Sequence, residues 1–358
     1  MLNNTSLFPS EYQHLAPSIS VMAAFIRMFK DKWITPPQPT TEDYSGRVVM
    51  VTGATSGIGK EAAYKFAALG ASQVILAARD LNKGESTKAE LAKRLGRDDA
   101  LAVWELDMMS YDSVVAFADR AHALEHLDVA ILNAGVHRAS YHVGEQGWEE
   151  DLQVNTLSSV LLGVRLLAKL RQSKHYTGKT PVLEFVNSGL HQSAVVPSEV
   201  RQQPSILAYY NQREQFKEMN QYKYSKVFLM YATNQLASEV SSEEVIITSI
   251  CPGVVNSDLG RDHFFPGVFV LAAAIVFLIM KSPSQGANLV LSGATQGEAV
   301  HGRFWQSDMI KPVPPALRGA AMKELGSRVW HEMVETLKKE VPQFDKWLEA
   351  ALEQKQRG

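Results

Sequence analysis

From about residue 45 the chain alternates short apolar runs with longer amphipathic stretches. Runs rich in valine, isoleucine and leucine predict β-strands at 48–51, 74–77, 102–104, 129–132, 182–186, 245–250 and 302–305. Apolar residues at helical spacing predict helices at 59–69, 82–95 and 114–124. Strands that are apolar throughout and separated by helices are typical of a parallel sheet covered on both faces. The pattern therefore predicts an α/β fold, a single domain in which helices cover both faces of a doubly wound parallel sheet of about seven strands.

Residues 1–44 lie outside this alternation, and we expect them to form an N-terminal extension. The extension ends in a proline-rich connector at 34–40, since proline is excluded from helix interiors and central strands. The residues before the connector could form a helix with one apolar face, made of Val21, Phe25, Met28 and Phe29. The basic residues Arg27, Lys30 and Lys32 would lie elsewhere on this helix. Such a helix fits a membrane surface, a lid or packing on the domain, and the sequence leaves all three open.

The domain itself is expected to span 45–345, with an amphipathic helix at 328–347 and a C-terminal tail at 346–358. Two segments are candidates for a substrate lid, a polar one around 197–221 and an apolar one around 258–285.

The apolar lid segment contains seventeen uncharged residues at 264–280, interrupted early by Pro266 and Gly267. A membrane crossing needs about 20 residues, so we expect a lid and pocket wall that could touch a membrane surface rather than span it. A buried helix or an oligomer contact remains the alternative.

The charge and cysteine content of the chain limit its possible functions and its cellular compartment. The formal net charge of −2 excludes a general nucleic-acid-binding protein, because such domains carry a basic excess. The single cysteine, Cys251, excludes a disulfide within the chain and favours a reducing compartment. It lies at the end of an apolar run, so we expect a buried thiol. The first twenty residues do not read as a secretory signal, which indicates a cytoplasmic protein with membrane association left open.

A glycine-rich turn follows the first predicted strand and opens a helix, with the sequence Thr52-Gly53-Ala54-Thr55-Ser56-Gly57-Ile58-Gly59. Glycines in this context allow a tight turn and a close approach of the backbone to a pyrophosphate. The free N–H groups and the dipole at the helix N-terminus favour the phosphate charge. The turn therefore predicts a dinucleotide site, although an ordinary structural turn would share the same glycines.

The residues at the end of the second predicted strand indicate whether the chain binds NAD(H) or NADP(H). An acidic residue there would accept the ribose hydroxyls and repel a 2′-phosphate. This chain has Ala78 and then Arg79 at that point, and Lys60 follows the glycine turn. A guanidinium suits a phosphate by charge and geometry, so NADP(H) is predicted. Asp80 is the competing residue, since it would face the ribose if the strand were to end later.

Tyr222 and Lys226 are four residues apart and are therefore neighbours on one helix face. A free tyrosine has a pKa near 10, and a nearby ammonium would lower that pKa by favouring the phenolate. No other tyrosine in the segment 209–231 has a lysine four residues later. The pair is thus a candidate for proton transfer, with a solvated helix face as the alternative.

Taken in order, the motifs resemble the short-chain dehydrogenase/reductase superfamily over about residues 45–310. The matching positions are the turn at 52–59, Asn133-Ala134-Gly135 after a strand, Asn155, Ser188, Tyr222 with Lys226, and Pro252-Gly253. The resemblance implies a Rossmann-type fold and an oxidoreductase. The long interval before Tyr222 resembles the retinol-dehydrogenase-like branch, and the N-terminal connector resembles fungal members that serve secondary-metabolite biosynthesis.

The resemblance also implies roles for the catalytic residues. Tyr222 would give a proton to a carbonyl oxygen or take one from a hydroxyl, and Lys226 would also hold the nicotinamide ribose. Ser188 would hydrogen-bond the reacting oxygen, and Asn155 would order a proton-relay water. The full set of predicted cofactor-binding residues is Gly53, Ser56, Gly57, Ile58, Gly59, Lys60, Arg79, Asp107, Asn133, Tyr222, Lys226, Val255 and Ser257.

We therefore expect an NADP(H)-dependent enzyme that interconverts a carbonyl and an alcohol on a bulky, lipophilic small molecule. No metal is expected, because no His, Cys or Asp cluster with ligand spacing accompanies His191. A homo-oligomer remains open. The alternative function is a cofactor-binding sensor or scaffold that keeps the fold without catalysis.

Overall fold

The computed structural model describes residues 16–259 and 277–352. Most of the apolar segment predicted at 264–280, and with it the centre of the predicted lid at 258–285, lies outside these residues. The predicted C-terminal tail at 346–358 is described only as far as Leu352.

A single sheet forms the centre of the molecule, with strand order β3-β2-β1-β4-β5-β6-β7-β8. All neighbours are parallel except the last pair. The strands are β1 (Val48–Thr52), β2 (Gln73–Ala78), β3 (Leu101–Glu105), β4 (Val129–Leu132), β5 (Val182–Val186), β6 (Ile246–Cys251), β7 (Phe304–Gln306) and β8 (Met309–Ile310). The predicted fold class is confirmed. The eighth strand was not predicted, because two residues carry no periodicity.

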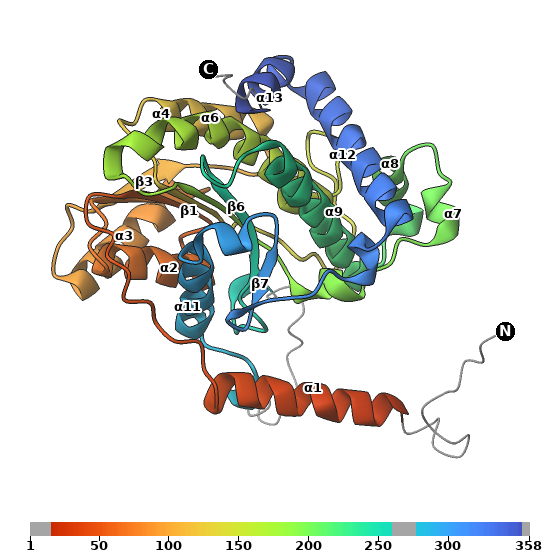
Figure 1. Ribbon diagram of the computed structural model, residues 1–358, viewed down its shortest axis with the longest axis horizontal. Helices are drawn as coiled ribbons and strands as arrows, with labels where there is room; N and C mark the ends of the chain where they lie inside the picture. The colour runs from red at the N-terminus through yellow and green to blue at the C-terminus, as the bar shows by residue number, and fades with distance from the viewer. Residues whose placement is uncertain (1–15, 260–276, 353–358) are drawn as a thin grey trace.

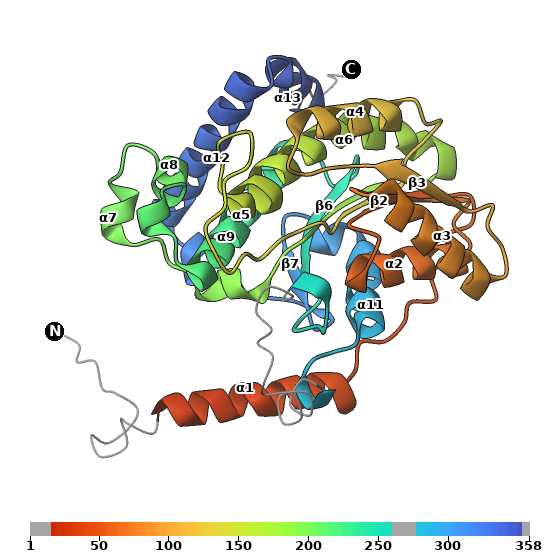
Figure 2. The same ribbon diagram turned by 180° about the vertical axis from the view of Figure 1, so that it is seen from behind.

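Helices cover both faces of the sheet (Figures 1 and 2). One face carries α2 (Gly57–Ala68), α3 (Leu81–Leu95) and α11 (Pro283–Ala294), and the other carries α4 (Tyr111–His122), α6 (Ser159–Thr177) and α9 (Glu218–Glu239). Each face has its own apolar core. Strand residues are buried on both sides, which is why the strands appear in the sequence as continuous apolar runs.

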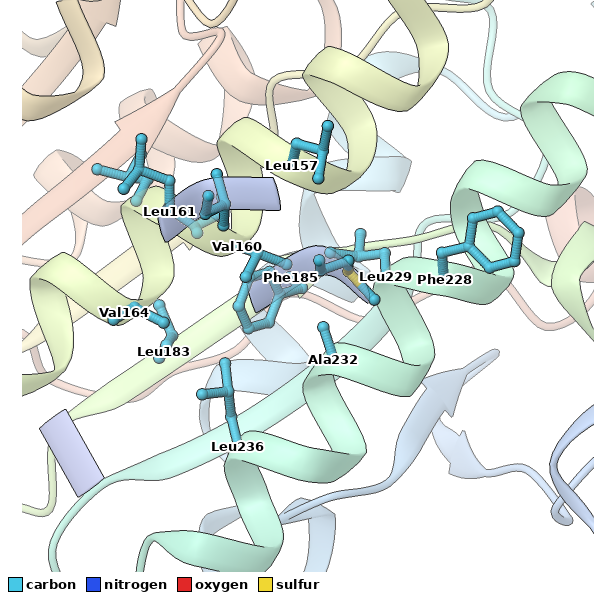
Figure 3. Close-up of a cluster of buried hydrophobic side chains, with 14 of the residues drawn as sticks. Leu157, Val160, Leu161, Val164, Leu183, Phe185, Phe228, Leu229, Ala232 and Leu236 are labelled. Carbon is cyan, nitrogen blue, oxygen red and sulfur yellow. The ribbon is translucent and has the colours of Figure 1, made fainter. Parts of the chain in front are cut away.

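The packing of α6 and α9 on β5 fixes the backbone that carries the candidate site (Figure 3). Phe185 of β5 lies between the two helices, with Leu229 beside it. A Cβ on Gly163 would lie 2.8 Å from the Phe185 ring, so only glycine lets α6 approach the strand this closely. A packed contact of this kind leaves α9 little freedom to shift along its axis.

The segment 197–221 forms short helices that pack on the domain rather than an irregular loop. It contains α7 (Ser198–Arg201), α8 (Ile206–Tyr210) and a 3₁₀ turn at Arg213–Gln215. Glu332 of α12 (Ala320–Glu340) accepts hydrogen bonds from the N–H groups of Ile206 and Leu207, at 2.7 and 3.0 Å. The segment is thereby fixed to the C-terminal helix.

The prediction of one helix over 328–347 is wrong, because the chain forms two. Helix α12 ends at Glu340, and α13 (Phe344–Leu352) begins after a turn that contains Pro342. A proline disfavours the helical conformation of the residue before it, and Val341 is extended. Arg165 of α6 lies over the Trp347 ring of α13, so the predicted domain boundary at residue 345 falls inside a helix that packs on the domain.

Helix α1 (Ala16–Trp33) lies outside the layers (Figures 1 and 2). Its C-terminal end is attached to the domain: Gln285 donates to the carbonyl of Lys32 at 3.0 Å, and Asn288 donates to that of Pro37 at 2.9 Å. In the described ranges, none of the helices combines the length and the apolar character that a membrane crossing requires.

Candidate active site and cofactor site

The predicted cofactor residues gather at the carboxyl ends of β1 and β4, where the strand order reverses. Crevices at such switch points are the usual ligand sites of open α/β sheets. Asn133, directly after β4, donates through Nδ2 to the carbonyl of Thr52 at 2.9 Å. The N–H of Ala134 donates to the Thr52 hydroxyl at 2.9 Å. These two bonds hold the ends of β1 and β4 together behind the glycine turn.

The glycine turn has the geometry that a pyrophosphate requires. Gly53 and Gly57 have φ values of 65° and 53°, which favour glycine. A Cβ on Gly59 would lie 2.4 Å from the carbonyl oxygen of Gly53, so no larger residue fits there. Ser56 precedes α2 and makes no side-chain cap to it, which leaves the helix N-terminus available to an anion. The turn therefore fits the dinucleotide predicted from the sequence.

The loop after β6 lies against the glycine turn. A Cβ on Gly57 would lie 3.2 Å from Cβ of Ser257, so two predicted cofactor residues from distant parts of the chain meet here. Val255 and Ile58 both face Gly286 of α11, where a Cβ would lie 2.8 and 3.2 Å from their methyl groups. Their side chains therefore support the walls of the site by packing.

Of the predicted adenosine-side residues, Asp107 follows β3 and accepts a hydrogen bond from the N–H of Met109 at 2.9 Å. Lys60 forms an ion pair with Glu90 at 3.0 Å, which partly neutralises the charge predicted to face a phosphate. Arg79 lies exposed directly after β2. Strand β2 ends at Ala78, and the side chain of Asp80 caps α3 by accepting from Lys83 N–H at 3.1 Å. Asp80 thus has a structural partner, and the competing interpretation of that residue loses support.

Tyr222 and Lys226 lie in the second and third turns of α9, with exposed fractions of 6% and 4%. The Lys226 ammonium lies 5.8 Å from the centre of the Tyr222 ring and donates to the carbonyl of Val186, at the end of β5, at 3.0 Å. The alternative of a solvated helix face is therefore excluded, because both side chains are buried.

Asn155 lies in a π-helical turn (Gln153–Ser158) between α5 (Glu150–Leu152) and α6. Its amide pairs twice with the backbone of Val136, accepting at 2.9 Å and donating at 2.8 Å, and it donates to the Ser225 hydroxyl at 3.0 Å. A Cβ on Gly135 would lie 3.0 Å from Asn155 Oδ1 and 3.7 Å from Lys226 Nζ, so the two groups lie on one side of that glycine. Single π-helical turns often occur at functional sites.

Ser188 follows β5. Its side chain lies close enough to that of Tyr222 for a hydrogen bond between them, which lowers the pKa of Tyr222. The position of Ser188 is set on two sides: its N–H donates to Asn187 Oδ1 at 2.8 Å, and its carbonyl lies 2.7 Å from Nδ1 of His191. Burial lowers the pKa of His191 to about 4, so this imidazole is neutral near pH 7 and Nδ1 carries the hydrogen of the short contact. His191 is a wall residue that positions Ser188.

Cys251, at the end of β6, is buried as predicted. Its sulfur accepts from the N–H groups of Gly189 and Gly253 at 3.2 and 3.3 Å. The thiol therefore joins the loop that carries Ser188 to the Pro252-Gly253 loop, and burial raises the pKa of Cys251.

The protonation state of Tyr222 differs from the sequence prediction. Burial raises its pKa well above the ordinary value, and the hydrogen bond with Ser188 offsets only part of that rise. The expectation that Lys226 lowers the tyrosine pKa is therefore wrong for the protein by itself, since desolvation dominates and the lysine is not among the groups that lower that pKa. Burial also lowers the pKa of Lys226, to about 8.

The sequence reasoning missed a pair of buried carboxyl groups behind this site. Glu149 caps the short helix α5, and Asp151 lies in that helix one turn before Asn155; both are fully buried. Glu149 accepts from the amide of Gln221 at 2.6 Å, directly before Tyr222. Burial raises the pKa of Asp151 to about 8, and the Lys226 charge opposes that rise. The only sequence signal was the i, i+4 spacing of Asp151 and Asn155.

His137 is a second missed residue. Its ring lies against that of Tyr222, with centroids 4.6 Å apart. It follows the Asn133–Gly135 motif closely in sequence, but nothing in its spacing indicated which way it faces. Across the part of the chain that the structure describes, no group of three His, Cys, Asp or Glu residues could hold a metal ion.

Comparisons with known proteins find relatives of this chain over most of its length. A family model described as short chain dehydrogenase matches residues 47–179. The short-chain dehydrogenase/reductase ffsI of Aspergillus flavipes is 35% identical over 317 residues, which cover 87% of this chain and 92% of the relative. The short-chain dehydrogenase/reductase phmF of Phaeosphaeria nodorum is 34% identical over 309 residues, with 85% and 90% covered.

Among solved structures, a short-chain dehydrogenase from Sphingobium yanoikuyae in complex with NADPH is similar to this chain with a TM-score of 0.52. The match covers 80% of this chain and 95% of that one, at 19% identity. At this identity the likeness concerns the fold alone.

Proposed function

Because this chain belongs to the short-chain dehydrogenase/reductase family, we propose that it is an NADP(H)-dependent enzyme that interconverts a carbonyl and an alcohol on a bulky lipophilic substrate. The observation that carries the proposal is the cluster of buried Tyr222, Lys226 and Asn155 with half-buried Ser188, beside a glycine turn that fits a pyrophosphate. A binder without catalysis has no use for a desolvated tyrosine and lysine, since burying both groups costs stability.

Within this cluster Tyr222 is the proton donor in reduction and the acceptor in oxidation. Its raised pKa keeps it protonated near neutral pH, which suits donation to a carbonyl oxygen. Ser188 would hydrogen-bond the same oxygen, and Lys226 would hold the nicotinamide ribose. When bound, the cofactor supplies or accepts the hydride. Binding of a substrate also excludes water from the cluster, which strengthens each of these interactions.

The cofactor preference rests on Arg79. Its guanidinium lies exposed where β2 ends, so it is available to a 2′-phosphate, and Asp80 is engaged as the cap of α3. Lys60 has Glu90 as its partner and contributes less. The similar Sphingobium enzyme was solved with NADPH, which agrees with this preference.

The substrate class rests on exposed apolar side chains that are close in sequence to Ser188, Tyr222 and Pro252. Leu190 lies two residues after Ser188, Met219 three before Tyr222 and Val254 two after Pro252, with exposed fractions of 38%, 48% and 47%. Side chains of this kind around a polar reaction centre favour a large apolar ligand. We extend the proposal to secondary metabolism in a fungus, by analogy with the fungal relatives.

The test is a Tyr222→Phe variant assayed for NADPH-dependent reduction of a panel of lipophilic ketones and aldehydes. Turnover should fall by about 10²- to 10⁴-fold, because proton donation is lost, while NADPH still binds. Tyr224→Phe is the matched control, since Tyr224 lies in the same helix and donates only to the carbonyl of Val195. Wild-type turnover in Tyr222→Phe would refute the mechanism. NADPH binding without turnover by the wild type on any panel member would favour the sensor alternative.

The cofactor preference is tested with Arg79→Ala. Loss of a charged hydrogen bond to the 2′-phosphate should weaken NADPH binding by about 10- to 100-fold and leave NADH binding nearly unchanged. Arg97→Ala is the control, because Arg97 is an exposed arginine that pairs with Asp99. Equal losses for the two cofactors would overturn the assignment.

A further inference from the structure

We propose that helix α1 and the adjoining residues 277–278 form a surface that docks on a membrane containing anionic lipids. The surface consists of six exposed apolar side chains, those of Met22, Ile26, Phe29, Trp33, Phe277 and Leu278. We call it the docking surface. The inference goes beyond the proposed function and does not depend on it.

The four side chains on α1 form one stripe. Met22, Ile26, Phe29 and Trp33 follow the spacing of one helix face and lie within an arc of roughly 60° at 100° per residue. Their exposed fractions are 59%, 58%, 37% and 46%. A folded protein has no reason to leave a whole helix face of this composition in water, so the stripe indicates a contact.

The stripe continues onto a second segment of the chain. The rings of Trp33 and Phe277 lie 5.5 Å apart, and the indole N–H of Trp33 donates to the carbonyl of Leu278 at 2.9 Å. Phe277 and Leu278 are 63% and 39% exposed. Two segments some 245 residues apart therefore present one continuous apolar surface.

The charge around the stripe identifies the partner as an anionic membrane surface. Arg27 and Lys30 are exposed on one flank of the stripe. The ammonium of Lys32 lies 4.7 and 4.6 Å from the ring centres of Trp33 and Phe277. An apolar stripe with a basic flank and an aromatic residue at its end is the pattern of helices that lie in a bilayer interface. Such a helix lies on the membrane rather than across it, in line with its length and charge.

Docking here would place the active site next to the membrane. Asp31 of α1 accepts from Ser307, directly after β7, at 3.3 Å, and residue 281 bridges to Val255, just after β6. The carboxyl ends of these strands are the end of the sheet that carries Ser188 and Cys251 (Figure 1). A lipophilic substrate would thus move between bilayer and site with little exposure to water.

The experiment uses the full chain in a vesicle co-sedimentation assay, without substrate or cofactor. Vesicles of phosphatidylcholine with 30% phosphatidylserine are compared with phosphatidylcholine alone. The wild type should bind the mixed vesicles more tightly, and 0.5 M salt should weaken that binding by screening.

Two variants separate the apolar and the charged parts of the docking surface. The double substitution Met22→Gln with Ile26→Gln should weaken binding to the mixed vesicles by at least about tenfold, because two apolar side chains no longer enter the interface while the charge stays the same. The double substitution Arg27→Gln with Lys30→Gln should weaken it by about fivefold per charge and leave binding to neutral vesicles unchanged.

Leu81→Gln is the matched control, since Leu81 is 45% exposed at the start of α3, away from α1. Circular dichroism and thermal melting establish that each variant is folded. Wild-type protein that fails to bind the mixed vesicles overturns the proposal. Unchanged vesicle binding by the Met22/Ile26 variant also overturns it. A third contrary result would be a wild-type dimer in light scattering that becomes monomeric in the Met22/Ile26 variant, with neither protein binding vesicles. The assay measures binding and not turnover, so it tests docking separately from catalysis. An inactive Tyr222→Phe protein should therefore still bind the mixed vesicles.

Discussion

Replacing Asp151 by asparagine removes a buried carboxyl group from behind Lys226. Asp151 is fully buried; Oδ1 accepts from the N–H of Arg138 at 3.2 Å, and Oδ2 has no hydrogen-bond partner within the described part of the chain. Burial and the neighbouring Glu149 raise its pKa from 3.8 to about 8, and the charges of Lys226 and Arg138 oppose the rise. Asparagine has the same shape and cannot ionise.

The magnitude follows from linkage. The folded protein binds the Asp151 proton more tightly than the unfolded chain, so this group's stabilising contribution is complete below pH 4 and is lost as the pH rises towards 8. Each unit of pKa difference is worth about 1.4 kcal/mol. Between pH 5 and pH 8 the wild type should therefore lose about 4 kcal/mol of unfolding free energy relative to Asp151→Asn.

The assay is urea unfolding of both proteins at pH 5, 6, 7 and 8. The exposed residue Asp98 provides the control, and Asp98→Asn should follow the wild type throughout. A difference between wild type and Asp151→Asn that stays constant within about 1 kcal/mol over this range would refute the reasoning.

Activity gives an independent readout of the same substitution. The Asp151 carboxylate raises the pKa of Lys226, which burial lowers to about 8. Without that carboxylate the lysine should lose its proton at lower pH, and the alkaline limb of the kcat/KM profile should move towards acid. A limb that moves towards higher pH would contradict the electrostatic coupling.

Two further predictions concern the glycine turn and the segment 197–221. Gly59→Ala should abolish dinucleotide binding, measured by fluorescence titration, because its Cβ would lie 2.4 Å from the Gly53 carbonyl oxygen and the turn must open. Glu332→Ala should lower the unfolding free energy by about 2–3 kcal/mol in urea, because the buried N–H groups of Ile206 and Leu207 lose a charged acceptor.

Each of these predictions has a contrasting variant. Gly178→Ala changes a glycine far from the site, at the end of α6, and should leave cofactor binding intact. Glu335→Gln alters an exposed acid in the same helix as Glu332 and should leave stability within about 0.5 kcal/mol. Tight cofactor binding by Gly59→Ala, or wild-type stability of Glu332→Ala, would show that the contact in question is dispensable.

The sequence by itself determined the parts of this protein that depend on local spacing. Strands buried on both faces must be apolar throughout, so their positions could be predicted, and with them the parallel sheet. The turn at 52–59 needs glycine because its backbone takes positive φ and meets itself closely. Tyr222 and Lys226 were found because a helix brings residues four apart together, whatever the rest of the chain does.

Only the tertiary structure decided what surrounds these groups. Glu149 bonds to Gln221 across 72 positions, and Asp151 approaches Lys226 from another helix, contacts that no local pattern contains. Burial by the assembled layers reversed the predicted direction of the Tyr222 pKa, because desolvation depends on neighbours far away in the chain. The same holds for α1, whose amphipathic pattern left three interpretations open. Its exposed stripe became visible only once the fold had placed residues 277–278 beside Trp33.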